Sequence, residues 1–560
     1  MHANHKKYLP FEPIRLPDRR WPSNRITKPP IWCSVDLRDG NQALPEPMNL
    51  EEKLMLFDAL VGFGFKQIEV GFPSASEVEF QVVRTLIEEN RIPDDVTIQV
   101  LTPARDHLIE RTFEALEGCE RAIVHLYNNI SPVFRELVFH TDKQGVLDMA
   151  VRGATKIREL ADARPDGGKD LTIEYSPEMF SGSEMDFALS VCEQVLDALG
   201  ATTERPVILN LPSTVQMSTP NDYADQIEYF IRQLPNRERA IISCHPHNDR
   251  GTGVADAELA MLAGAQRLEG TLFGNGERTG NLDLVIVALN LFTQGIDPGL
   301  DFSQLNDLKR VYERSTRMRI HERQPYSGEL VFTAFSGSHQ DAIKKALDHR
   351  EQHHPEHWQV PYLPIDPADL GRMYEPIIRI NSQSGKGGAA YVLHSQFGYN
   401  LPRTMHPEFG TIVQREADRL GQELSAEQLL RLFISSYCDV QVPYHLMRHD
   451  IVESGQNGQS IVKFTGLIGY RTREYTLRGE GNGPIDAFFS AMHEAHIDGF
   501  EFVSYHEHAI GKGSDAKAVA YIELRYNDKT FFGVGVESNV SIASIKGVLS
   551  AVNRALQMEE

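Results

Sequence analysis

The chain lacks the features that mark secreted, membrane-spanning and nucleic-acid-binding proteins. Its 560 residues include only five cysteines, with no C-x-x-C pair, which argues against a disulfide framework and a structural zinc knuckle. No run of about 18 apolar residues occurs, and the N-terminus lacks the apolar core of a secretory signal. The net charge of −22 argues against nucleic acid or an anionic membrane as a partner. We therefore expect a cytoplasmic protein with reduced thiols.

The length of the chain sets the number of domains that we expect. A chain of 560 residues is too long for one hydrophobic core, so two or three domains are predicted. The patterns described below divide the chain into four parts: an N-terminal extension (1–30), a catalytic barrel (31–300), a linker region with small subdomains (301–425) and a regulatory α+β domain (426–560).

Short apolar runs alternate with amphipathic helical segments between residues 31 and 300. Eight such strand–helix units over roughly 270 residues match a TIM barrel in number and length, with an open doubly wound sheet as the alternative. Polar motifs at the carboxyl ends of the runs favour the barrel, because barrel sites are built there. The predicted strands are Ile31–Leu37, Gln67–Phe72, Thr97–Leu101, Ala122–Leu126, Leu171–Tyr175, Val207–Leu211, Ala240–Cys244 and Leu268–Leu272.

The C-terminal part contains a weak internal repeat. Tyr475–Ala495 lines up in outline with Phe532–Ala555, and each copy reads as a strand, a turn of small residues and an apolar helix. This pattern predicts two β-rich units that each pack a helix, which together form a compact ligand-binding domain. In the linker region, two small Gly/Ser loops stand out, at Phe335–His339 and at Asn381–Gly388.

A candidate metal site combines residues from segments of the predicted barrel that lie far apart in the sequence. His245 and His247 lie two positions apart at the end of a strand, so both imidazoles point to one side. Asp39 follows the first strand, and Asn281 could add an amide oxygen after the last. Two imidazoles and a carboxylate suit Mg²⁺, Mn²⁺ or Zn²⁺, among which the sequence does not choose. The alternative interpretation is a chance His-x-His pair.

Other polar residues near the strand ends are candidates for the chemistry. Arg38, next to Asp39, could stabilise an oxyanion, or it could form a surface ion pair. Glu69 interrupts an apolar strand and needs a cationic partner, for which Arg38 is the obvious choice. Glu178 is a candidate acid or base, whereas the candidate substrate contacts are Gln42, His125 and Thr214. The Gly-rich stretch Gly274–Gly280 lacks dinucleotide-binding spacing.

Four segments taken together resemble the 2-isopropylmalate synthases of the longer type, which have a C-terminal regulatory domain. The segments are Ser34–Leu44 (SVDLRDGNQAL), Ser243–Asp249 (SCHPHND), Gly274–Asn281 (GNGERTGN) and Asn381–Gly388 (NSQSGKGG). The resemblance implies a TIM barrel that condenses acetyl-CoA with 3-methyl-2-oxobutanoate. The products would be (2S)-2-isopropylmalate and CoA, in the first committed step of leucine biosynthesis.

The resemblance also assigns roles to residues. A divalent metal, with Mg²⁺ foremost and Mn²⁺ or Zn²⁺ as alternatives, would be held by Asp39, His245, His247 and Asn281. Arg38 would stabilise the alkoxide, and proton removal would involve His339 and Tyr374, with Glu178 nearby. Family members are homodimers in which the linker region of one chain covers the barrel of the other, so His339 could act in trans. K⁺ is a possible activator.

Leucine is the feedback inhibitor that the resemblance implies. Its expected site lies between the paired C-terminal domains, near Gly481, Asn482, Gly483, Asp486 and Gly513. The alternatives are a citramalate synthase, a homocitrate synthase or an inactive metabolite sensor. The strand ends show no extra basic residue for a second carboxylate, which favours a substrate with a branched apolar side chain.

Overall fold

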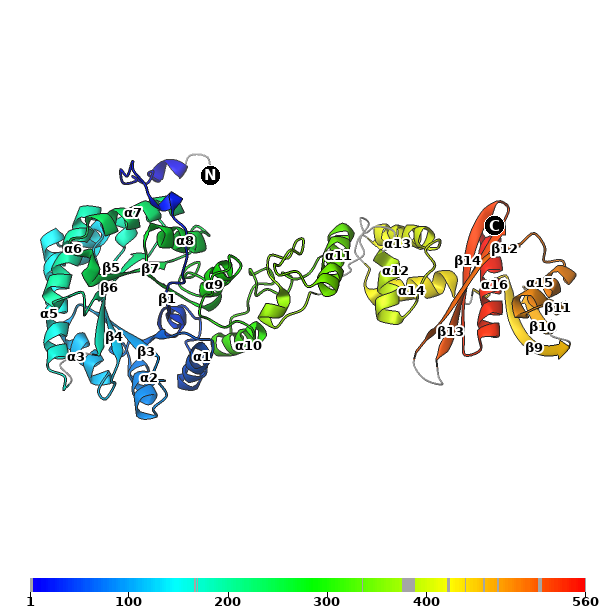
Figure 1. Cartoon of the computed structure of the whole chain (residues 1–560), viewed down its shortest axis with the longest axis horizontal. Helices are drawn as coiled ribbons and strands as arrows, with labels where there is room; N and C mark the ends of the chain where they lie inside the picture. Colours follow the sequence, from blue (N-terminus) through cyan, green and yellow to red (C-terminus); the bar gives the residue numbers. More distant parts are fainter. Residues whose placement is uncertain are drawn as a thin grey trace. The chain divides into compact units, whose positions relative to one another are not determined.

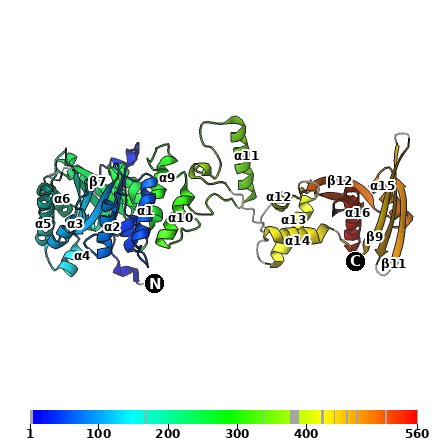
Figure 2. The same ribbon diagram turned by 90° about the horizontal axis from the view of Figure 1, so that it is seen from below.

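The computed structural model describes residues 4–558 except 166–167, 169, 335, 375–387, 421–423, 439, 457–458, 471–472 and 512–515. The chain folds into two compact units. One comprises Met1–Phe332 with Leu363–Tyr374, and the other comprises Thr333–Tyr362 with Glu375–Glu560. Figures 1 and 2 show the elements of each unit from two sides.

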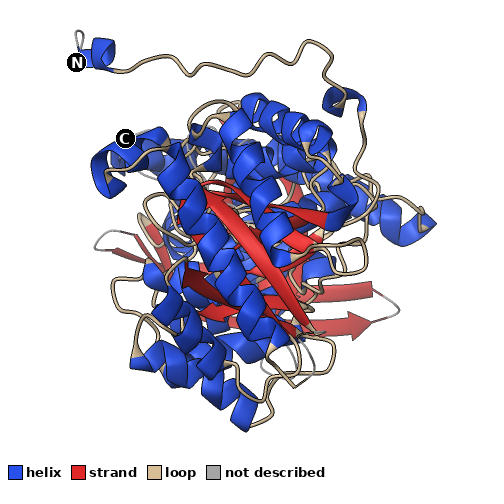
Figure 3. Cartoon of the chain, turned by 90° about the vertical axis from the view of Figure 1, so that its left-hand side faces the viewer, coloured by secondary structure: helices blue, strands red, loops and turns tan. Residues whose placement is uncertain are grey.

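The first unit is a closed barrel of eight parallel strands in chain order, which confirms the predicted TIM barrel and excludes the open sheet. Figure 3 shows helices on the outside of the strands. The strands are β1 (Ile31–Ser34), β2 (Gln67–Gly71), β3 (Thr97–Pro103), β4 (Ala122–Asn129), β5 (Leu171–Glu178), β6 (Val207–Ser213), β7 (Ala240–Pro246) and β8 (Arg267–Gly270). The helices are α1 (Leu50–Gly62), α2 (Glu77–Glu88), α3 (Asp106–Ala115), α4 (Pro132–Phe134), α5 (Lys143–Asp162), α6 (Met185–Leu199), α7 (Pro220–Gln233), α8 (Gly253–Ala263), α9 (Leu284–Phe292) and α10 (Leu305–Thr316).

The barrel closes where β1 pairs with β8, with Ser34 opposite Gly270. Gly270 is required at this position by packing, because a Cβ atom there would lie 2.5 Å from the carbonyl oxygen of Leu282. Closure brings the end of the first strand beside the end of the last, although more than two hundred residues separate them in the chain.

Strands β4 to β7 end two or three residues later than the apolar runs predicted. The runs stop at Leu126, Tyr175, Leu211 and Cys244, whereas the hydrogen-bonded strands continue to Asn129, Glu178, Ser213 and Pro246. The apolar pattern stops where the side chains become polar, but backbone pairing continues with the neighbouring strand. The end of each strand therefore includes residues that the sequence assigned to loops.

The first strand, in contrast, ends earlier than the sequence predicted. It was predicted to reach Leu37, but it ends at Ser34, and Asp36–Gly40 form a single π-helical turn, η3. Asp36 is buried and accepts hydrogen bonds from the backbone N–H of Leu272 (3.0 Å) and the hydroxyl of Ser34 (2.7 Å). A carboxylate anchored in this way turns the chain before the apolar run ends.

The second unit contains four helices followed by two three-stranded antiparallel sheets, in the orders β11-β10-β9 and β12-β13-β14. The helices are α11 (Gly337–His353), α12 (Gly388–Phe397), α13 (His406–Leu420) and α14 (Ala426–Tyr437). The C-terminal elements are β9 (Tyr444–Gln456), β10 (Gln459–Tyr470), β11 (Arg473–Gly481), α15 (Pro484–Glu494), β12 (Glu501–Ile510), β13 (Lys517–Tyr526), β14 (Lys529–Glu537) and α16 (Val540–Gln557). Helix α15 follows β11 and helix α16 follows β14, which confirms the predicted repeat of strand, turn and helix.

Two apolar cores hold the second unit together. In one, α12–α14 pack against β13 and β14, with Phe433 and Val534 among the buried residues. In the other, α15 and α16 lie together between the two sheets, with Phe488 and Val548 buried. The helices α12–α14 thus share a core with the C-terminal sheet.

The loop predicted around His339 is helical in its second half, because Gly337–His339 form the first turn of α11. The other Gly/Ser loop of the linker region, Asn381–Gly388, lies outside the described residues except for Gly388. Among the described residues, no helix combines the length and the apolar composition that crossing a membrane requires.

Candidate active site

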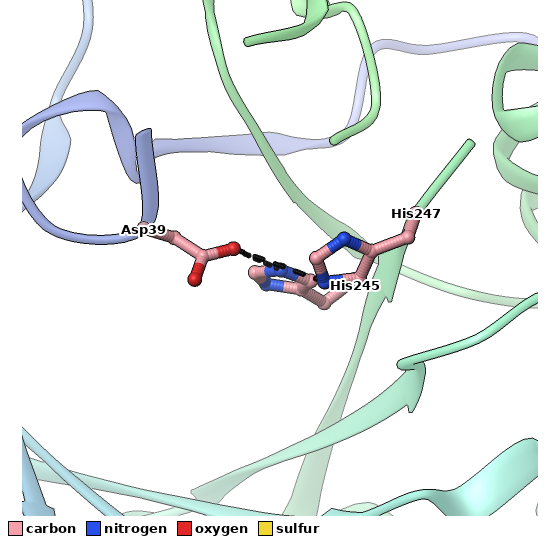
Figure 4. A group of neighbouring side chains, drawn as sticks. All are labelled: Asp39, His245 and His247. Atoms are coloured by element: carbon pink, nitrogen blue, oxygen red, sulfur yellow. Dashed lines mark ion pairs between the residues drawn. The ribbon is translucent and has the colours of Figure 1, made fainter. Parts of the chain in front are cut away.

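Asp39, His245 and His247 converge at the carboxyl end of the barrel. Figure 4 shows the three side chains pointing toward one another, Asp39 from the turn after β1 and the histidines from the end of β7. Asp39 Oδ2 lies 3.3 Å from His245 Nε2 and 3.8 Å from His247 Nε2. The Oδ1 atom of Asn281 lies 3.1 Å from His245 Nε2. The structure thus brings all four predicted ligands together.

The geometry fits a divalent cation. One ligand atom from each of Asp39, His245 and His247 lies within 4.8 Å of the others, and all three residues are buried. Among the described residues, Asp39 Oδ2 has no hydrogen-bond partner, although it is buried. A buried carboxylate oxygen without a donor is costly unless a cation or proton satisfies it. Carboxylate, imidazole and amide ligands suit a borderline or hard divalent metal.

The charges of the three ligands depend on their neighbours. Burial raises the pKa of Asp39, but the Arg38 guanidinium and the two imidazoles outweigh burial and hold this pKa well below its usual range. Burial and the adjacent His245 lower the pKa of His247 to about 4. Burial also lowers the pKa of His245, but the carboxylates of Asp39 and Glu269 reverse this and raise it to about 9. His245 must therefore lose its proton to serve as a ligand.

A cavity of about 340 Å³ surrounds the three ligands. Its walls include every barrel residue that the sequence nominated for catalysis or substrate binding, namely Arg38, Gln42, His125, Glu178 and Thr214. The apolar part of the wall comes from Phe72, Leu101 and Pro212. The cavity thus has both ionic and apolar lining residues.

Arg38 is held rigidly at this cavity. Its Nε atom donates to the fully buried Glu69, and its Nη1 atom donates to Asp39 Oδ1 at 2.8 Å. The predicted pairing of Arg38 with Glu69 is confirmed, and Arg38 is not in a surface ion pair. A guanidinium fixed beside a cation site is preorganised to stabilise an oxyanion.

Glu178 and His125 complete the polar wall. Burial raises the pKa of Glu178, against the opposing effects of Asn129 and Arg38. A carboxyl group with a raised pKa is a better proton carrier near neutral pH than an exposed one. His125 Nδ1 lies 2.7 Å from Glu69 Oε2, and its Nε2 lies 2.7 Å from Ser176 Oγ.

Sequence reasoning missed a layer of buried polar side chains inside the barrel, of which Asn210 also lines the cavity. Its members are Gln99, Glu174, Asn210, Arg267 and Glu269, which come from β3, β5, β6 and β8. Arg267 and Glu269 lie two positions apart on β8, so both point to the same side of the strand. Polar residues at alternate positions of otherwise apolar runs were the available signal.

Known proteins resemble the chain over its whole length. Residues 29–311 match the HMGL-like family, residues 329–394 match the alpha-isopropylmalate synthase post-catalytic domain, and residues 423–556 match the LeuA allosteric (dimerisation) domain. The hydroxymethylglutaryl-CoA lyase of Pseudomonas aeruginosa, a solved structure, is 20% identical over 53% of this chain and 96% of its own, with a TM-score of 0.44.

Sequence relatives are much more similar. A 2-isopropylmalate synthase of Clostridium acetobutylicum is 52% identical over 98% of this chain and 99% of its own length. One of Parvibaculum lavamentivorans is 54% identical over 98% of this chain and 96% of its own. The chain belongs to the 2-isopropylmalate synthase family. The HMGL-like family is metal-dependent, and the group Asp39, His245 and His247 is the candidate metal site of this member.

In this member of the 2-isopropylmalate synthase family, two residues expected to act in proton transfer come from outside the barrel strands. Tyr374 ends the described part of the first unit, and His339 belongs to the second unit. The His339 ring stacks on Tyr362, with centroids 3.9 Å apart. All the residues that line the described cavity belong to the barrel, so neither His339 nor Tyr374 is among them.

The residues that 2-isopropylmalate synthases lead us to expect around leucine lie at a second cavity, of about 620 Å³. Asn482, Gly483 and Asp486 line it, and Gly481 ends the preceding strand β11. Gly513 lies outside the described residues. The structure adds lining residues from β12 and from α16, namely Phe502, Tyr505, Glu507, Val540, Ser541 and Ser544.

Proposed function

We propose that the chain is a 2-isopropylmalate synthase that condenses acetyl-CoA with 3-methyl-2-oxobutanoate and releases CoA. The observation that supports this most directly is the convergence of Asp39, His245, His247 and Arg38 on one buried cavity in a chain of this family. The reaction needs a keto acid held firmly, a carbanion equivalent formed from the acetyl methyl group, and a stabilised alkoxide.

Asp39, His245, His247 and Asn281 would hold the cation, which we propose to be Mg²⁺, with Mn²⁺ or Zn²⁺ as alternatives and K⁺ as an activator. The bound cation supplies Lewis-acid polarisation of the keto acid. Thr214 lies on the cavity wall, and its hydroxyl accepts a hydrogen bond from Met179 N at 3.0 Å. Its proton is then directed elsewhere, so it can donate to the carboxylate of the substrate.

Arg38 would neutralise the oxygen of the ketone as it becomes an alkoxide. Its guanidinium is fixed before the substrate arrives by Glu69 and Asp39, so no reorganisation is needed during attack. Gln42 and His125, which also line the cavity, would contact the substrate.

Proton removal from the acetyl methyl group would fall to His339 and Tyr374, with Glu178 near the reacting carbons. An imidazole titrates close to working pH, and a phenol can donate to an oxyanion. We propose that His339 reaches the barrel of the partner chain in a homodimer, which is consistent with the LeuA dimerisation domain.

The cavity favours a branched apolar side chain over a second carboxylate. Among the described residues, the basic side chains that line it, besides the histidines, are Arg38 and Arg278. Arg38 is paired with Glu69, and Arg278 with Asp249 at 2.6 Å. Homocitrate synthesis would need a further cation for the distal carboxylate, whereas we assign Arg38 to the alkoxide and Arg278 is paired with Asp249.

Leucine would bind in the second cavity as a feedback inhibitor. The first turns of α15 and α16 both line it, and helix N-termini attract a carboxylate. Asp486 and Glu507 offer negative charge to an ammonium group, and Phe489 and Phe502 offer an apolar wall. We propose the cytoplasm as the location, as expected for a biosynthetic enzyme that uses acetyl-CoA.

The test is CoA release, followed with a thiol reagent, from acetyl-CoA and a panel of 2-oxo acids, each with and without chelator and leucine. The panel is 3-methyl-2-oxobutanoate, pyruvate, 2-oxobutanoate and 2-oxoglutarate. We expect chelator-sensitive, leucine-inhibited turnover that favours 3-methyl-2-oxobutanoate. A preference for another acid would keep the chemistry and reject the substrate, and no turnover by folded, metal-loaded protein would reject the reaction.

A further inference from the structure

The two imidazoles of the candidate metal site differ in the hydrogen bonding of their Nδ1 atoms. His245 Nε2 faces Asp39 and Asn281, and its other ring nitrogen, Nδ1, lies 2.8 Å from Glu269 Oε2. His247 Nδ1 is buried and has no hydrogen-bond partner among the described residues. One ligand is therefore backed by a carboxylate, and the other is not.

Glu269 is fully buried, and each of its two carboxylate oxygens has two hydrogen-bond donors. Besides His245, its Oε2 accepts from Asn210 Nδ2 at 2.9 Å. Its Oε1 accepts from Arg267 Nη1 at 2.8 Å and from Gln99 Nε2 at 3.0 Å. Four donors from four strands fix the position and orientation of this carboxyl group.

The donors are themselves part of one network. Gln99 Nε2 also donates to Glu69 Oε2 at 2.7 Å, and Gln99 Oε1 accepts from Arg267 Nη2 at 2.7 Å. Glu69 in turn holds Arg38 and His125. The side-chain amide of Gln99 thus connects Glu69, which binds Arg38, with Glu269, which binds His245.

We infer that Glu269 is a positioning residue of the metal site: by accepting the Nδ1 proton of His245 it fixes the tautomer whose Nε2 lone pair points to the cation. A carboxylate behind a ligand imidazole also increases its donor strength, and removal of such a partner typically costs about 10–100-fold in metal affinity. This inference rests on the metal site of the proposed function. It makes His245 the stronger of the two imidazole ligands.

The chain provides a matched control in Glu174. This residue is also fully buried, on β5, and lies 3.3 Å from Arg267 Nη1, but its neighbouring imidazole is His125 at 3.4 Å rather than His245. Burial raises the pKa of Glu174 well above its usual range, although Arg267 opposes the shift. Glu174→Gln therefore changes a buried carboxyl group of the same layer whose imidazole neighbour, His125, is not a proposed metal ligand.

The experiment compares the parent, Glu269→Gln and Glu174→Gln as full-length, metal-stripped proteins. Zn²⁺ affinity is measured by competition with a chromophoric chelator, and Co²⁺ is added to record the visible absorption of the site. We expect Glu269→Gln to bind Zn²⁺ about 10–100-fold more weakly and to shift the Co²⁺ bands. Glu174→Gln should stay within about threefold of the parent and keep its spectrum.

Thermal unfolding of the metal-free proteins separates positioning from folding. A folded Glu269→Gln with parental Zn²⁺ affinity and parental Co²⁺ bands would overturn the inference, and so would equal losses in the two variants. Asp39→Asn tests the site itself: if Asp39→Asn also binds Zn²⁺ like the parent, the proposed metal site fails. If only Asp39→Asn loses the metal, the site stands and the role of Glu269 is refuted.

Discussion

At the scale of single residues, Asp39 shows how one carboxylate depends on its surroundings. It is buried between Arg38 and two imidazoles, and one oxygen has no hydrogen-bond donor among the described residues. The same Asp on a surface would be an ordinary ion-pair partner. In the barrel, its free oxygen makes it a candidate metal ligand.

Asp39→Asn tests this assignment with little change in volume. We expect loss of the bound divalent metal and at least a ~100-fold fall in turnover, because the keto acid loses its Lewis acid. Metal content by elemental analysis and the CoA-release rate are the measurements. Asp249→Asn, which removes a carboxylate bound to Arg278 beside the same cavity, is the control and should retain the metal. Near-normal turnover in Asp39→Asn would contradict the ligand role.

A second residue-scale prediction concerns Asp256 on α8. Its side chain is buried, Gln216 Nε2 donates to Oδ2 at 2.7 Å, and burial raises its pKa to about 7 from an ordinary value of 3.8. The folded protein thus binds this proton more tightly than the unfolded chain, so the contribution of Asp256 to stability falls as pH rises between about 4 and 7. Asp256→Asn removes this loss, which amounts to at most about 4 kcal/mol.

The measurement is the Tm of Asp256→Asn and of the parent at pH 5 and pH 8. We expect the variant to gain stability relative to the parent as pH rises. Asp301→Asn, an exposed position, should show no such gain. A difference in Tm that is the same at both pH values would show that Asp256 does not titrate as proposed.

At the scale of elements, α16 connects two parts of the second unit. Its first turn lines the second cavity with Val540, Ser541 and Ser544, whereas its second half binds the segment between α14 and β9. Asn553, which is fully buried, donates to the carbonyl oxygens of Val440 and Tyr444, both at 2.6 Å, and accepts from Tyr444 N at 2.8 Å.

Asn553→Ala should therefore destabilise the second unit strongly. It leaves three backbone groups without their partner and creates a small cavity, for which we expect a loss of about 2–4 kcal/mol in the free energy of unfolding. Denaturant unfolding followed by far-UV circular dichroism is the measurement. Asn539→Ala, which removes the N-cap of the same helix, should cost only about 1 kcal/mol. Equal losses would show that the three hydrogen bonds add little.

At the scale of the whole molecule, each unit has a cavity of its own. The barrel cavity contains the proposed metal ligands, and the cavity near the start of α15 and α16 is the one that we propose for leucine. The proposed effector site is thus separate from the chemistry, and leucine can be tested without altering the barrel.

Deletion of residues 426–560 should abolish inhibition by leucine, because it removes the whole second cavity. The deletion also exposes the faces of α12 and α13 that pack against α14, β13 and β14, so the remaining activity is not the criterion. Val540→Trp is the milder variant: Val540 is 43% exposed at the cavity, and a larger side chain there fills the space without disturbing the core. Leucine inhibition curves of the CoA-release rate are the measurement. Parental inhibition in both variants would place the effector elsewhere.

Local patterns in the sequence were enough to predict the main architecture. The alternation of strands and helices was read from the spacing of apolar side chains, which repeats every 2 residues in a strand and every 3.6 in a helix, so a short stretch of sequence reveals it. For the same reason, His245 and His247 could be assigned to one side of a strand, and the C-terminal repeat could be read as two sheets with one helix each. The match of polar residues to strand ends then predicted the barrel cavity.

Only the tertiary structure decided which residues meet. The turn at Asp36 depends on the backbone of Leu272, and the support of His245 depends on Glu269, 24 positions away on the neighbouring strand. The role of Gln99 as a bridge requires three strands in one closed ring. Such contacts leave no periodic trace in the sequence, because they are set by register and closure between distant segments. The sequence by itself determined the elements and the ligand types, and the closed barrel determined the network that orients them.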